Sequence, residues 1–74
     1  MTDSEFRYMK EGIATDLIQY LVTDYHVSLQ EALRILYESD TYSKLSDPST
    51  GIYFQSSRYV FTFLQHELQT GVIG

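Results

Sequence analysis

The side chains best suited to metal binding or proton transfer in this sequence are two histidines, and each stands alone. His26 and His66 have no second ligand at helical spacing, and His66-Glu67 does not belong to an H-E-x-x-H pattern. The chain has no cysteine, which removes thiolate ligands and cysteine nucleophiles. We therefore predict no metal site, and surface or capping roles for both histidines.

Other potentially reactive groups have ordinary structural explanations. Glu38, Asp40 and Asp47 lie in one polar stretch, but the alternating oxygen ligands and central glycine of a calcium loop are missing. Ser56 and Ser57 lack the glycine elbow and the neighbouring base of a nucleophile, and helix capping explains both. No glycine-rich loop follows a strand. We predict no catalytic residue, no cofactor and no enzymatic activity.

The elements that would position these residues are helical. Apolar side chains recur at helical spacing from Phe6 to Leu21, so we predict a first helix over about 3 to 25. Asp3 or Ser4 is its expected N-cap, and Gly12 weakens it by roughly 1 kcal/mol relative to alanine. A second apolar stripe on the same helix consists of Ala14, Ile18, Val22 and Tyr25.

The second helix is predicted over about 29 to 38. Ser28 and Glu31 have the S-x-x-E spacing of a capping box, in which each side chain accepts a hydrogen bond from the other residue's backbone N–H. The apolar residues expected to be buried are Leu29, Ala32, Leu33, Leu36 and Tyr37.

A polar connector, 39 to 56, separates this helix from the next. A cap at Ser39 can start one short turn, and 47 to 51 has turn chemistry with proline second and glycine last. We expect the connector to be ordered and packed across one end of the fold through Tyr42, Leu45, Ile52 and Phe54.

The last helix is predicted over about 57 to 69. Ile52 to Gln55 is expected to be extended, Ser56 or Ser57 to cap the helix, and Gly71 to end it. The predicted fold class is all-α, with three main helices in one small domain over residues 1–74.

Charge and hydropathy restrict the partners. The net charge is −5 and the five basic residues are dispersed, whereas phosphate backbones require clustered Lys and Arg. The longest apolar run is too short to cross a bilayer, and the acidic start is unlike a signal peptide. We expect a cytoplasmic protein with a basic or neutral protein partner, and neither nucleic acid nor membrane binding.

Two sets of residues are candidates for protein contacts. Tyrosine suits both core edges and interfaces, so the tyrosines near the connector either roof the core or form a recognition surface. These are Tyr37, Tyr42, Tyr53 and Tyr59. The stripe Ala14, Ile18, Val22 and Tyr25 is a candidate homodimer contact, unless the connector folds back and covers it.

Three sequence blocks carry a resemblance: S-x-x-x-A-L-x-x-x-Y from Ser28, S-x-T-Y-x-K-L from Ser39, and T-G-I-Y-F-Q-S from Thr50. The chain resembles a group of small uncharacterised bacterial proteins, of the domain-of-unknown-function type, related to short partner proteins encoded near ADP-ribosyltransferase-like toxins. The resemblance implies a bacterial source and a binding function, and it supplies no catalytic residue.

These observations predict a small non-catalytic bacterial protein-binding module, antitoxin-like or a regulatory accessory. The alternative is a helix-turn-helix-like DNA-binding transcriptional regulator. That motif joins its helices by a turn of about 3 to 4 residues. Here 39 to 56 intervenes, unless the short turn at Tyr42 is the recognition element, and that turn offers Lys44 against Asp40 and Asp47.

Overall fold

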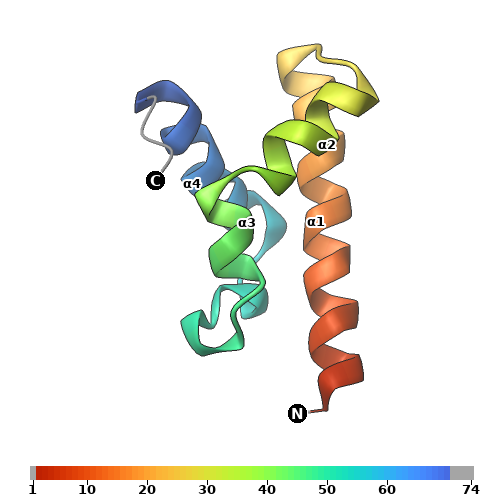
Figure 1. Cartoon of the computed structure of the whole chain (residues 1–74), viewed down its shortest axis with the longest axis vertical. Coiled ribbons are helices and arrows are strands. Elements are labelled where there is room, and N and C mark those ends of the chain that lie inside the picture. The colour runs from red at the N-terminus through yellow and green to blue at the C-terminus, as the bar shows by residue number, and fades with distance from the viewer. Residues whose placement is uncertain (1, 71–74) are drawn as a thin grey trace.

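Helices account for all the regular structure in the computed structural model, which describes residues 2–70 (Figure 1). In chain order they are α1 (Asp3–Tyr25), α2 (Leu29–Tyr37), α3 (Asp40–Leu45), the 3-10 turns η1 (Pro48–Thr50) and η2 (Ile52–Phe54), and α4 (Ser57–Thr70). The all-α prediction is confirmed. The layout differs from the predicted one, because the connector contains a fourth helix, α3.

The long helix α1 sets the length of the molecule. Its 23 residues rise by about 1.5 Å each, which matches the 35 Å longest dimension. The prediction of Asp3 or Ser4 as the N-cap was wrong. Thr2 caps the helix, and its side chain accepts a hydrogen bond from the Glu5 backbone N–H at 3.2 Å. Thr2 and Glu5 form a complete capping box, a T-x-x-E signal that the sequence contains.

The link between α1 and α2 reverses the chain. His26 caps the end of α1 in the left-handed conformation, with φ of 57°, so it has the capping role predicted for it. Beyond the link, Leu29 was expected in the core but is 60% exposed. It lies in the first turn of α2, at one end of the long axis, where few elements surround it (Figure 1).

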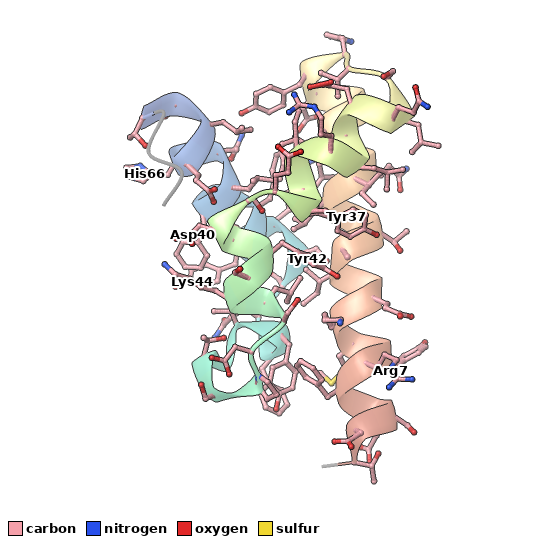
Figure 2. The ribbon with its side chains drawn as sticks, viewed as in Figure 1. Arg7, Tyr37, Asp40, Tyr42, Lys44 and His66 are labelled. Atoms are coloured by element: carbon pink, nitrogen blue, oxygen red, sulfur yellow. The ribbon has the colours of Figure 1, made fainter. Side chains whose placement is uncertain are left out.

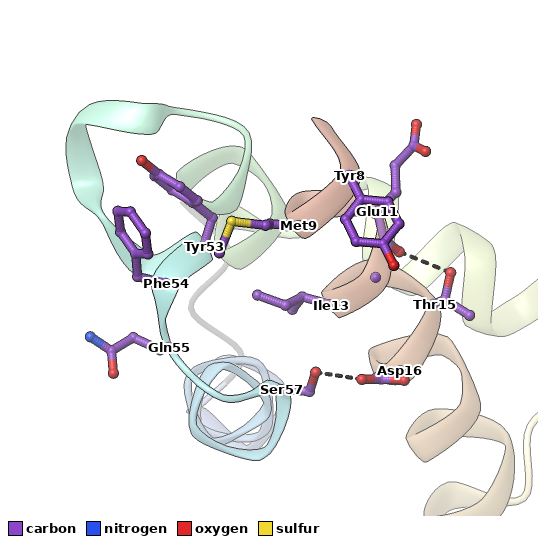
Figure 3. Close-up of a pocket in the computed structure, with 11 residues that line it drawn as sticks. Tyr8, Met9, Glu11, Ile13, Thr15, Asp16, Tyr53, Phe54, Gln55 and Ser57 are labelled. Atoms are coloured by element: carbon purple, nitrogen blue, oxygen red, sulfur yellow. Dashed lines mark hydrogen bonds between the residues drawn. The ribbon is translucent and has the colours of Figure 1, made fainter. Parts of the chain in front are cut away.

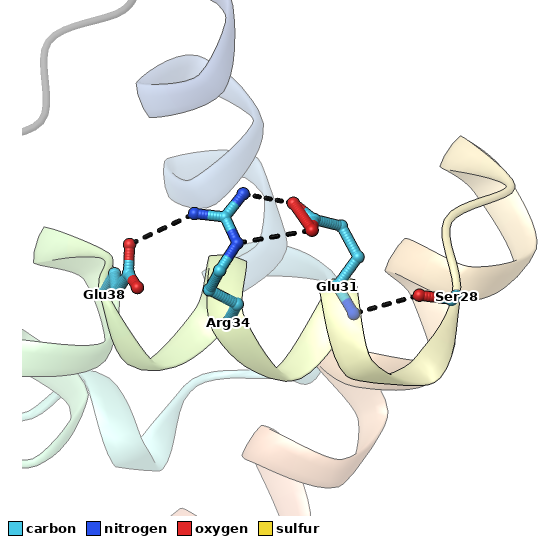
Figure 4. Close-up of polar contacts among 4 residues, drawn as sticks. All are labelled: Ser28, Glu31, Arg34 and Glu38. Atoms are coloured by element: carbon cyan, nitrogen blue, oxygen red, sulfur yellow. Dashed lines mark hydrogen bonds and ion pairs between the residues drawn. The ribbon is translucent and has the colours of Figure 1, made fainter.

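Only half of the predicted capping box of α2 forms. The Ser28 side chain accepts a hydrogen bond from the Glu31 backbone N–H at 3.1 Å. The Glu31 carboxylate does not return to Ser28 but binds the Arg34 guanidinium, which also donates to Glu38 at 3.3 Å (Figure 4). The hydrogen bond from Arg34 is the main cause that lowers the pKa of Glu31. Arg34 competes successfully because it offers a charged donor one turn away.

The core is formed where α1, α2, α3 and α4 meet. Its fully buried side chains are Leu17, Leu21, Ala32, Leu36, Leu45, Val60, Phe61 and Leu64. On α2 the buried side passes through Ala32 and Leu36, and Tyr37 remains 54% exposed although burial was predicted. Leu45 connects the short α3 to this core.

A polar contact fixes the start of α3 to α4. The Glu67 carboxylate, 7% exposed, accepts hydrogen bonds from the backbone N–H groups of Asp40 at 2.8 Å and Thr41 at 2.9 Å. The Thr41 hydroxyl donates to the same carboxylate at 2.6 Å. Ser39 completes the cap by accepting from the Tyr42 N–H. A side chain from α4 thus satisfies the free donors of α3 and complements its positive end.

The turns η1 and η2 return the chain from α3 to α4. Gly51 joins them with φ of 71°, a conformation that glycine adopts without strain. Residues Ile52 to Phe54 were predicted to be extended but form a 3-10 turn, with about three residues per turn. Tyr53 therefore points inward and is 8% exposed, while Phe54, expected to pack inward, is 62% exposed.

The start of α4 is fixed twice. The Ser56 hydroxyl accepts from the Tyr59 backbone N–H at 3.2 Å, as predicted for the N-cap. The Ser57 hydroxyl donates to the Asp16 carboxylate at 2.6 Å, which attaches α4 to α1. Gly71, the predicted end of this helix, lies outside the described residues.

Replacing Glu67 tests the contact between α3 and α4. Glu67→Ala leaves two backbone N–H groups and one hydroxyl without their acceptor in a buried place, so we expect the free energy of unfolding to fall by about 3 kcal/mol. Glu67→Gln keeps one acceptor oxygen and should lose about half as much. Urea unfolding measures both, with the exposed Gln69→Ala on the same helix as the control. Equal stabilities for Glu67→Ala and Gln69→Ala would contradict this role.

Candidate functional site

An open groove separates the first half of α1 from the segment that leads into α4. Its volume is ≈ 550 Å³, within the range of about 300–1,000 Å³ that ligand sites occupy. Figure 3 shows Met9, Ile13 and Tyr53 between its two sides, while the side chains of Phe54 and Gln55, on the η2 side, point away from α1. The groove is therefore an apolar hollow between two separate parts of the chain.

Two contacts hold the sides of the groove in place. At one end the Phe6 and Tyr53 rings pack edge to face, with their centroids 4.9 Å apart. At the other end the Ser57 hydroxyl donates to Asp16 (Figure 3). Since Ile13 and Tyr53 are both buried, the floor belongs to the folded core, and the groove is preformed.

The rims carry aromatic rings that the fold does not bury. Tyr8 on α1 is 80% exposed, and Phe54 on η2 is 62% exposed. Phe54 stacks at 4.4 Å on Tyr53, so its position is fixed although most of its surface faces solvent. Exposed aromatic rings beside an apolar hollow are typical of binding surfaces.

The charge in the groove is negative. Asp16 and Glu11 are its charged lining residues, and no basic residue lines it. One Asp16 oxygen accepts from Ser57, whereas Glu11 lies on the rim with its carboxylate directed away from the floor (Figure 3). The groove thus combines aromatic rings with carboxylates.

Gly12 lines the groove and has no role in the packing of the fold. It is exposed in the interior of α1, where glycine costs roughly 1 kcal/mol relative to alanine. A Cβ at this position would meet no other part of the protein within 4 Å. Its missing side chain leaves open space between Tyr8 and Asp16 along α1.

A second hollow, of ≈ 390 Å³, lies between α3 and α4. It places Ile52 and Phe63 beside charged side chains, and Figure 2 shows Asp40, Lys44 and His66 together on that side of the molecule. Lys44 Nζ lies 3.9 Å from Asp40 Oδ2, so these two charges already face each other. Two carboxylates of this hollow already have partners within the protein: Asp40 faces Lys44, and Glu67 accepts hydrogen bonds from the start of α3.

The four tyrosines predicted as a partner surface belong to three separate groups of aromatic rings. Tyr37 and Tyr42 pack edge to face at 4.9 Å, at the junction of α2 and α3 (Figure 2). Tyr53 contacts Phe6 and Phe54, and it is buried in the floor of the groove. Tyr59, 49% exposed, packs on Phe63 at 5.1 Å. Sequence reasoning missed Tyr8 and Phe54, because spacing alone does not show which rings lie across from each other.

The four residues of the predicted self-association stripe differ in exposure. Ala14 is buried at 8%, and Ile18 is partly buried against the core. Val22 and Tyr25 are 37% and 38% exposed. Tyr25 packs on Phe61 of α4, which covers a side of α1 that was expected to be open.

One arginine already lies between an aromatic ring and a carboxylate within the fold. The Arg58 guanidinium lies 3.9 Å from the centroid of the Tyr20 ring and donates to Asp24 at 3.1 Å. Tyr20 and Asp24 occupy consecutive turns of α1, and Arg58 reaches them from α4. This contact joins the two helices next to the groove, because Asp16, Tyr20 and Asp24 follow one another at intervals of four residues on one face of α1.

Residues 2–70 were compared with the requirements of a metal site and of a membrane-spanning helix. This part of the chain contains no group of three His, Cys, Asp or Glu residues that could hold a metal ion. None of its helices combines the length and hydropathy required to cross a bilayer. His66 lies on the surface, in the hollow between α3 and α4.

Replacing Gly12 tests whether the fold needs a glycine there. We expect Gly12→Ala to raise the free energy of unfolding by about 1 kcal/mol, because alanine favours the helix and its methyl group enters open space. Thermal and urea unfolding measure the change. Gly51→Ala is the matched control and should destabilise by about 1 kcal/mol, since its φ is positive. A loss of stability in Gly12→Ala would show that the fold itself requires this glycine.

Comparison with protein-family models, with curated proteins and with solved structures gives no match to this chain. The exposure, contacts and charge of residues 2–70 are therefore what indicate its function.

Proposed function

We propose that this chain is a non-catalytic protein-binding module, and that the groove between α1 and η2 is its binding surface. The observation that carries the proposal is the pair of exposed rings, Tyr8 and Phe54, on the two rims of an apolar hollow. Partly exposed aromatic side chains with apolar surroundings contribute most strongly to protein interfaces.

The shape of the groove favours a protein segment over a small molecule. Small-molecule sites generally enclose most of the ligand surface, whereas this groove is open along the molecular surface. Its preformed floor of Ile13 and Tyr53 can receive a side chain, while the rims contact the flanking backbone. Such a surface suits one anchoring residue within a longer segment.

The DNA-binding alternative receives less support from the geometry. Glu38 and Ser39 separate α2 from α3, a link that is slightly shorter than the turn of helix-turn-helix motifs. However, Glu67 occupies the N-terminus of α3, where a phosphate would bind, and Lys44 faces Asp40. A protein partner is the better fit, in line with the antitoxin-like or regulatory role that the resemblance to bacterial partner proteins implies.

A selection from a random peptide library displayed on phage tests the proposal. We expect immobilised wild-type protein to enrich peptides whose binding is lost in the double variant Tyr8→Ser/Phe54→Ser, because that variant removes both rims of the groove. The matched control, Tyr37→Ser/Tyr59→Ser, removes two exposed rings elsewhere and should retain binding.

Circular dichroism confirms that each double variant is folded before the comparison. If the selected peptides bind the Tyr8/Phe54 double variant but not the Tyr37/Tyr59 double variant, the binding surface lies outside the groove. Failure to enrich any peptide that binds the folded wild type would overturn the proposed function.

A further inference from the structure

We infer that the groove between α1 and η2 binds an arginine side chain presented by a protein partner. This inference rests on the proposed function and specifies the chemistry of the partner. The guanidinium would lie beside the Tyr8 ring on α1, with Asp16 as its main anionic contact. Glu11 on the rim would attract it.

The distribution of charge is the first argument. Three of the five basic residues are already paired: Arg34 with Glu31 and Glu38, Lys44 with Asp40, and Arg58 with Asp24. The other two, Arg7 and Lys10, do not line the groove, and Lys10 lies 5.9 Å from the Phe6 ring. The acids of the groove therefore have no cationic partner among the described residues, and a cation is the complement they lack.

The state of Asp16 is the second argument. Its hydrogen bond with Ser57 uses Oδ2, and Oδ1 has no hydrogen-bond partner among the described residues. A purely apolar anchor would reduce the access of water to this carboxylate without replacing the lost hydrogen bonds, which is unfavourable. A guanidinium supplies charged donors to Oδ1 and keeps a flat face for the rings.

The contact of Arg58 is the third argument, because the fold itself shows that this combination holds a guanidinium. There an aromatic ring at 3.9 Å and a carboxylate at 3.1 Å come from one side of α1. The groove offers the same kinds of group earlier on the same face of α1, where Tyr8 and Asp16 line it and no basic residue does. The rings of Tyr8 and Phe54 can attract a cation through their faces.

Gly12 is the fourth argument. It lies on α1 between Tyr8 and Asp16, and its lack of a side chain has no explanation in the packing of the protein. Glycine in a helix interior is explained where another chain must come close to the backbone. A partner segment that inserts an arginine between the rims would pass directly over this position.

Nuclear magnetic resonance titration of ¹⁵N-labelled wild type tests the inference. The probe is a capped eight-residue peptide of glycine and serine with two arginines, and the matched control has citrulline in place of each arginine. Citrulline keeps the shape and loses the charge. We expect the arginine probe to shift the amide signals of Gly12, Asp16 and Phe54, and to bind about tenfold more tightly than the citrulline peptide.

Two variants locate the effect. Asp16→Asn keeps an acceptor for Ser57 and removes the charge, and should weaken the arginine probe about fivefold. Gly12→Leu fills the groove and should abolish the shifts. Glu38→Gln removes one exposed charge at the C-cap of α2 and should leave binding unchanged. Gly12→Ala is the control for helix stability. Alanine stabilises α1 but fills less of the groove than leucine, so it should weaken the binding of the arginine probe less than Gly12→Leu does.

The outcomes separate this inference from the proposed function. Equal binding of the arginine and citrulline peptides, or shifts spread evenly over all acidic residues, would overturn the arginine inference. If the phage selection still yields groove-dependent peptides without enriched arginine, the protein-binding function stands and only the chemistry assigned to the partner is wrong. Absence of any groove-dependent peptide would overturn both.

Discussion

The fold depends on one buried carboxylate. A six-residue helix such as α3 is too short to be stable alone, and its free backbone donors face the interior. Glu67 satisfies these donors from α4, while Leu45 secures the other end of α3 in the core. Because α3 leads into η1 and η2, the same carboxylate indirectly sets the position of the segment that forms one side of the groove.

Much of the fold follows from local sequence signals. Apolar spacing predicts α1, α2 and α4, and side-chain caps at Ser28, Ser39 and Ser56 mark where helices begin. The role of Glu67 could not be predicted in the same way, since a charged residue at that position is usually exposed and its partners lie 26 and 27 positions away. Helical spacing also predicted burial of Leu29 and Tyr37, but it does not reveal where neighbouring helices end.

The candidate site was less predictable than the fold. Phe54 was expected to be buried, because Ile52 to Gln55 were predicted to be extended. The 3-10 turn instead directs Tyr53 inward and leaves Phe54 exposed. Gly12 was recognised as unfavourable for the helix, yet its position in a groove depends on packing between segments about 40 positions apart, as the Asp16 to Ser57 hydrogen bond illustrates. Long-range packing of this kind has no local signature.

The hydrogen bonds between Glu67 and α3 also close a loop in the chain. Forming that loop loses more chain entropy than forming the local α1–α2 hairpin, so its contacts should be made late in folding and open first. The segment from Asp40 to Ser57 then behaves as one cooperative unit, whose amide protons exchange with solvent sooner than those in the middle of α1. One side of the groove belongs to that unit and the other to α1. A molecule bound in the groove would therefore slow the opening of the loop and shift the order in which the protein unfolds.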